Sequence, residues 1–132
     1  MNDLDHAAQL LFSAERDIRA IKAMLNAESF SDEIFGFHVQ QAIEKLLKTW
    51  IAALGVEYPL THNIGRLLQV LESKGLDINI FADAIEYTAY AVEFRYGAVD
   101  LSDDPVDRIE AIRRVTELYE HVVDILDSKR EP

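Results

Sequence analysis

The sequence contains no cysteine, so the chain can form neither a disulfide nor a thiolate nucleophile. Its five glycines stand apart from one another, and the Gly-rich loops that cradle phosphates are therefore missing. No uninterrupted apolar run approaches the roughly 18 residues that span a membrane, and no signal-peptide core is found near the N-terminus. We therefore expect a cytoplasmic protein that does not engage a membrane.

Basic residues are also scarce. The chain has 13 Lys and Arg against 24 Asp and Glu, which gives a formal net charge of −11. This composition argues against a protein that coats nucleic acid, because such proteins need a basic face to neutralise phosphates. A small basic cleft is still compatible with the charge, since local distribution decides binding there. Lys45, Lys48 and Arg95 are candidates for such a cleft.

Helical periodicity, in contrast, extends along nearly the whole chain. Apolar residues recur at three- and four-residue intervals, and no convincing run alternates with period two. This pattern predicts an all-α fold, with residues 1–132 forming one domain built as an up-and-down bundle of about five helices. The expected helices cover about residues 3–27, 31–55, 62–73, 80–94 and 105–127.

Capping signals set the expected helix ends. Ser31 or Asp32 can cap the second helix, Thr61 the third, and Asp104, which precedes a proline, the fifth. Gly55 suits a left-handed cap at the end of the second helix.

The second helix has two distinct faces. At 100° per residue, one face collects the apolar residues Val39, Ile43, Leu46, Leu47, Trp50 and Leu54. The opposite face carries the polar stripe His38, Gln41, Lys45 and Lys48. A solvated stripe opposite a core is the default interpretation of such a helix.

Two separated blocks of residues give this stripe a second interpretation. The first block is Phe37, His38, Gln40, Gln41, Glu44, Lys45 and Lys48, and the second is Tyr58, Pro59, Thr61 and His62. Together they resemble the HEPN family, whose members carry a Phe-His-x-Gln-Gln-x-x-Glu-Lys-x-x-Lys helix followed by a Tyr-Pro-x-Thr-His turn. The resemblance also implies a helical bundle.

The polar stripe and one later segment supply the expected ligand-binding residues. They are His38, Gln41, Lys45, Lys48, Arg95 and Tyr96. Charge-assisted donors suit the phosphates of a nucleotide or RNA, and a tyrosine suits stacking on a base. The alternative for Arg95 is a structural salt bridge with Glu93 or Glu86.

Metal and cofactor sites are not expected. His6, His38, His62 and His121 fall on four different expected helices or helix starts, and no His-Glu-x-x-His pair places two ligands one turn apart.

The resemblance implies a test for catalysis. Ribonucleases of the HEPN family carry an arginine followed, after four to six residues, by a histidine. Arg95 matches that arginine, but the histidine positions hold Asp100, Leu101 and Ser102, none of which supplies an imidazole for proton transfer. Arg114 and His121 satisfy the spacing within the last expected helix, on one face, and are weaker candidates.

Partners follow from the resemblance and from the fifth helix. Many HEPN proteins are encoded beside a minimal nucleotidyltransferase as a two-component, toxin–antitoxin-like system, so such a partner is implied. The apolar residues of the fifth helix cover more than one narrow stripe, which favours a homodimer or higher oligomer. We therefore expect a binding module. The alternatives are a metal-independent endoribonuclease toxin and a purely structural oligomerisation module.

Overall fold

The computed structural model describes residues 3–26, 28–90 and 105–130. It contains α1 (Asp3–Ala23), α2 (Asp32–Ala53), α3 (Ile64–Ser73), the 3₁₀ helix η1 (Asn79–Tyr87) and α5 (Arg108–Arg130). The described residues contain no strand, and none of their helices is long and apolar enough to cross a membrane. The expected all-α bundle is confirmed.

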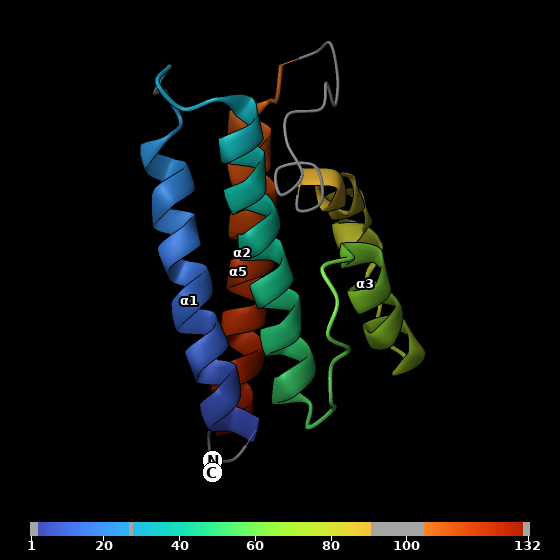
Figure 1. Cartoon of the computed structure of the whole chain (residues 1–132). Helices are drawn as coiled ribbons and strands as arrows, with labels where there is room; N and C mark the ends of the chain where they lie inside the picture. The colour runs from blue at the N-terminus through green and yellow to red at the C-terminus, as the bar shows by residue number, and fades with distance from the viewer. Residues whose placement is uncertain (1–2, 27, 91–104, 131–132) are drawn as a thin grey trace.

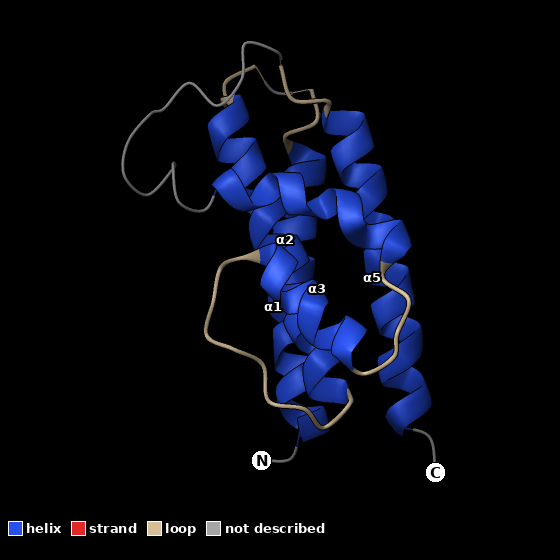
Figure 2. Ribbon diagram, turned by 90° about the vertical axis from the view of Figure 1, so that its right-hand side faces the viewer, coloured by secondary structure: helices blue, strands red, loops and turns tan. Residues whose placement is uncertain are grey.

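The bundle is organised around α2. Three long helices, α1, α2 and α5, lie alongside one another, and α3 and η1 form a second group beside α2 (Figures 1 and 2). Because α2 contacts all four other elements, its expected apolar face is buried, and Trp50 keeps only 2% of its surface exposed. Burying a large apolar side chain contributes roughly 1.5–3 kcal/mol, so this face supplies much of the core's stability.

The caps of α2 agree with expectation, whereas that of α3 does not. The Ile34 amide donates to Ser31 Oγ over 3.2 Å, and Gly55 adopts a left-handed φ of 75° just beyond the helix. The third helix begins at Ile64, and its cap is Asn63, whose Oδ1 accepts from the Arg66 amide at 3.1 Å. Thr61 is therefore not the cap, because its hydroxyl instead accepts from the Asn63 amide at 3.1 Å.

The fifth helix starts later than expected. It begins at Arg108 rather than near Pro105, because Asp107 Oδ1 accepts from the Glu110 amide at 3.0 Å and so occupies the capping position. The expected cap, Asp104, lies outside the described residues.

Arg108 explains why α1 ends at Ala23 rather than near residue 27. Its guanidinium donates to the carbonyl oxygens of Met24 and Phe30, at 2.6 and 2.7 Å, and pairs with Asp32 at 3.1 Å. The bond to Met24 satisfies a carbonyl just beyond the end of α1, and the bonds to Phe30 and Asp32 fix the link to α2.

The fourth expected helix is a 3₁₀ helix over most of its described length. The buried residues of η1 are Phe81, Ala84 and Tyr87, which recur every third residue. A 3₁₀ helix has 3.0 residues per turn, so this spacing keeps all three on one face, whereas an α-helix would rotate them apart. Residues 91–94 of the expected helix lie outside the described residues.

Much of the extra apolar surface of α5 is covered within the chain. Ile112, Tyr119 and Ile125 pack against the core, while Ile109 is 73% exposed. Self-association therefore stays a prediction, with Ile109 as the large apolar side chain that α5 leaves open among the described residues.

Candidate functional site

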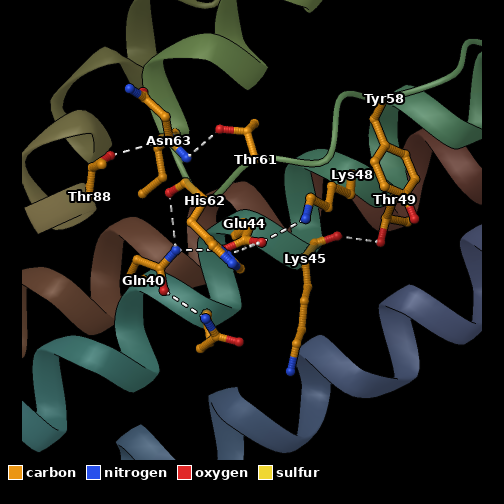
Figure 3. Close-up of polar contacts among 12 residues, drawn as sticks. Gln40, Glu44, Lys45, Lys48, Thr49, Tyr58, Thr61, His62, Asn63 and Thr88 are labelled. Atoms are coloured by element: carbon orange, nitrogen blue, oxygen red, sulfur yellow. Dashed lines mark hydrogen bonds and ion pairs between the residues drawn. The ribbon is translucent and has the colours of Figure 1, made fainter. Parts of the chain in front are cut away.

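The first part of the site is built on Glu44, a carboxylate that α2 buries to 4% exposure. Lys48 Nζ donates to its Oε1 at 2.6 Å, and Gln40 Nε2 donates to its Oε2 at 2.5 Å. His62 Nδ1 lies 3.0 Å from Oε1 and 3.1 Å from Oε2 (Figure 3). Glu44 therefore joins two residues of its own helix to the turn that precedes α3.

Electrostatics keep this carboxyl charged. Burial raises the pKa of Glu44, but hydrogen bonds from Lys48, His62 and Gln40 outweigh burial and hold the pKa below its ordinary value. The side chain is consequently an ionised acceptor that fixes its donors.

The second part of the site is built on Asp17 of α1, which is 8% exposed. Lys45 Nζ donates to its Oδ2 at 2.7 Å, and His38 Nδ1 lies 3.1 Å from its Oδ1. Figure 3 shows the Lys45 side chain running from α2 toward α1. The arrangement repeats that around Glu44, because each buried carboxylate holds one lysine and one histidine.

These four side chains, His38, Lys45, Lys48 and His62, are called the basic edge below. Their side chains are 32%, 27%, 13% and 48% exposed, in that order. The basic edge is thus partly exposed to solvent and partly buried. Each ammonium has three N–H donors and uses one on its carboxylate, so the edge retains donor capacity for an anion.

His62 is placed by the start of α3. The following residue, Asn63, caps that helix, and the Ile64 amide donates to Thr88 Oγ1 at 3.1 Å. The His62 carbonyl accepts from Gln40 Nε2 at 3.4 Å, which ties the turn to α2. The imidazole is therefore held against Glu44 through both its ring and its backbone.

Gln41 belongs to the same network. Its Nε2 donates to Gln40 Oε1 at 2.8 Å, so its amide supports the buried glutamine. Of the six predicted ligand residues, the structure brings together His38, Gln41, Lys45 and Lys48 around the two carboxylates. The other two, Arg95 and Tyr96, lie outside the described residues.

A neighbouring cleft offers room beside the basic edge. Lys48 Nζ lies 5.5 Å from the ring centroid of Tyr58, whose hydroxyl is 2.7 Å from His6 Nε2. His6 and Tyr58 also line an open cleft of about 480 Å³, together with Gly55 and Leu60. This volume lies within the range typical of small-ligand sites.

Arg114 and His121 have separate surroundings. Arg114 donates to Glu86 at 2.6 Å and to Glu110 at 3.3 Å. The His121 ring packs at 4.7 Å from Trp50. Seven residues of helix separate the two by roughly 10 Å along the axis, so they do not form a compact acid–base pair. Arg114 serves as an ion-pair residue here.

Asp17 was not singled out from sequence, and Glu44 and His62 were named only as parts of the two family blocks, without their contact with each other. The sequence does contain a clue to Asp17, because it lies one helical turn after Ala14 and next to Ile18, two apolar residues that α1 buries, and a carboxylate in such surroundings needs a partner. Within the described parts of the chain, no three His, Cys, Asp or Glu side chains are grouped in a way that could hold a metal.

Comparison with known protein families gives a match over most of the chain. Residues 7–126 match the HEPN domain, and that span includes both carboxylates and all four residues of the basic edge. No curated protein and no solved structure matches the chain. Because the match covers most of the sequence, this chain belongs to the HEPN domain family.

Proposed function

We propose that this HEPN domain is a binding module for the phosphates of a nucleotide or RNA and that the basic edge is its contact surface. One observation carries the proposal: two buried carboxylates hold two lysines and two histidines in fixed positions on an acidic protein. Donors fixed before binding lose less conformational entropy when the ligand arrives.

The cleft beside Tyr58 supports the same proposal. Lys48 connects it to the basic edge, because its ammonium lies near the Tyr58 ring while bonding Glu44. The Tyr58 ring is already stacked on His6, so the base would occupy the cleft that these two residues line rather than the face of the ring. A phosphate at the edge and a base in the cleft fit a nucleotide better than they fit an inorganic anion. Arg95 and Tyr96 stay predicted contributors.

A minimal nucleotidyltransferase is the proposed protein partner. Family membership supports this part of the proposal, because HEPN proteins often form such two-component systems. A homodimer or higher oligomer is part of the same proposal, with the exposed Ile109 supporting it.

A purely structural role is the second candidate, and burial favours it. Gln40 and Glu44 are 0% and 4% exposed, as expected for groups that stabilise one arrangement of α2 and the turn before α3. Ribonuclease activity receives less support, since Arg114 is engaged by carboxylates and His121 by aromatic rings. We expect RNA to stay intact with the purified protein in EDTA.

Calorimetric titration with a short single-stranded RNA separates these candidates. Lys45→Ala removes a charge-assisted donor and should weaken binding by roughly 1.5–3 kcal/mol. Lys74→Ala, at the exposed end of α3, is the matched control and should bind as wild type does. Lys45→Ala also removes the lysine partner of Asp17 and leaves that carboxylate only its contact with His38. The double variant Asp17→Asn/Lys45→Gln removes both charges of the pair, so it tests the lysine charge without leaving the aspartate charge behind. Unchanged affinity in both Lys45 variants assigns the edge a structural role.

A further inference from the structure

The side of α1 that faces away from the bundle carries two exposed arginines, Arg16 and Arg19. Among the residues that the structure describes, neither guanidinium makes an ion pair or a hydrogen bond. The chain has 24 acidic residues against 13 basic ones, so two neighbouring cations without a carboxylate partner are unusual for its composition.

The packing of α1 explains why these arginines have no partner. Glu15, one turn before Arg19, accepts a hydrogen bond from the Tyr119 hydroxyl of α5 at 2.6 Å. Asp17, next to Arg16, is held by Lys45 of α2 at 2.7 Å. Each carboxylate is therefore engaged by a neighbouring helix, and the arginines keep their donors for an external anion.

An exposed aromatic ring lies on the same face. At 100° per residue, Phe12, Arg16 and Arg19 fall within about 60° of one another, one to two turns apart. Phe12 is 60% exposed, and its ring contacts no other ring in the described parts of the chain. These three residues are called the α1 outer face below.

The α1 outer face is adjacent to the basic edge. Asp17, the carboxylate that holds one lysine and one histidine of the edge, follows Arg16 and is rotated from it by about 100°. On a helix 10–12 Å across, this rotation is roughly 10 Å along the surface. The α1 positions between the two are Ser13 and Ala20, whose side chains are small. Figure 3 shows Lys45 of the basic edge reaching toward α1.

We propose that one RNA strand runs from the basic edge across this strip to the α1 outer face, so that the ligand is a polynucleotide rather than a mononucleotide. The inference rests on the proposed function, because the basic edge must first bind phosphate. One phosphate cannot contact two sites roughly 10 Å apart, whereas successive phosphates of a strand can. Arginines beside an exposed aromatic ring match the alternating phosphates and bases of a single strand. Continuity with the basic edge favours RNA over an acidic protein as the occupant.

Two oligouridylates test the proposal by fluorescence anisotropy: a 5′-phosphorylated dinucleotide, which stays on the basic edge, and a strand of about 12 nucleotides. Arg16→Gln/Arg19→Gln should weaken binding of the longer strand roughly tenfold and leave binding of the dinucleotide unchanged. Its salt slope for the longer strand should fall by about 1.4, because each single-strand phosphate contact contributes about 0.7.

Two further variants complete the test. Lys129→Gln/Arg130→Gln removes the same charge from the exposed end of α5 and is the matched control, so it should bind both RNAs as wild type does. Phe12→Ala should weaken binding of the longer strand alone, by at least roughly fivefold, through lost stacking. All substituted side chains are exposed, and a thermal melt checks that each variant is folded.

The possible failures are distinguishable. If wild type binds neither RNA, the proposed function fails and the inference fails with it. If wild type binds both RNAs with the same affinity and salt slope, the basic edge keeps its role and the strand path is wrong. Equal losses in the α1 double variant and in the α5 control reflect net charge alone and also overturn the path. Oligoglutamate of matched charge is the remaining competitor. If it binds as tightly as the longer RNA and only the α1 double variant loses it, the α1 outer face accepts an acidic protein instead.

Discussion

Glu44→Gln is the most severe test of the contacts that Glu44 makes with Lys48, Gln40 and His62. The substitution keeps the size of the side chain and leaves an acceptor oxygen, but it removes the negative charge opposite Lys48, whose side chain is 13% exposed. Removing one partner of a buried ion pair costs about 3–5 kcal/mol. Lys48 retains some contact with water, so we expect a somewhat smaller loss, roughly 2–4 kcal/mol in the free energy of unfolding. For a domain of this size, this loss lowers Tm by roughly 6–20 °C.

Two further variants separate charge from packing. Glu44→Gln/Lys48→Met removes both charges and should recover most of the lost stability, because no buried charge is left unpaired. Glu72→Gln, on the exposed side of α3, is the matched control and should change stability by less than about 0.5 kcal/mol. Urea unfolding followed by circular dichroism measures all three. A loss below about 1 kcal/mol in the single variant, or a double variant no more stable than the single one, refutes the reasoning.

Acid titration tests the charge of Glu44 without changing the size or packing of its side chain. The pKa of Glu44 is lower in the folded chain than its ordinary value. Its contribution to stability is therefore complete above the unfolded pKa of about 4.3 and is lost as pH falls through the folded pKa. Between pH ~5 and the folded pKa, wild type should lose stability more steeply than Glu44→Gln. Parallel pH profiles would contradict a charged Glu44.

The remaining predictions concern the core and assembly. Trp50→Ala should cost about 3–5 kcal/mol by thermal or urea unfolding, because Trp50 is 2% exposed, and a shift of only a degree or two would mean that α2 faces another way. Gly36→Ala should cost roughly 1–3 kcal/mol, because an added methyl group overlaps the Tyr90 ring, and Tyr90→Ala should relieve part of that cost; a stability equal to wild type contradicts this packing. Sedimentation at micromolar concentration should show a dimer or larger, and a 15.0 kDa monomer throughout would remove self-association from the proposal.

The helices were largely predictable because their signals are local. The buried face of α2, the Ser31 cap and the left-handed Gly55 all follow from short-range periodicity and from the backbone preferences of single residues. The η1 region shows the limit of that approach. Its apolar residues fit both three- and four-residue intervals, and only tertiary packing of Phe81 and Tyr87 selects the 3₁₀ spacing.

Only the part of the site that lies on α2 was predictable from the sequence. The sequence places His38, Lys45 and Lys48 on one stripe, but it does not say which residues from other elements meet that stripe. Asp17 is 28 residues before Lys45, and the pair forms only because α1 packs against α2. Helical spacing therefore identifies the basic side chains of α2, and the fold identifies the carboxylate that α1 contributes.

The most direct test of the basic edge as a phosphate site is a backbone NMR titration of the labelled protein with short oligouridylate. The largest shift changes should fall on His38, Lys45, Lys48, His62 and their immediate neighbours, and they should weaken as salt rises because phosphate contacts release counterions. Changes confined to other surfaces, or no saturable change at low salt, would contradict the account.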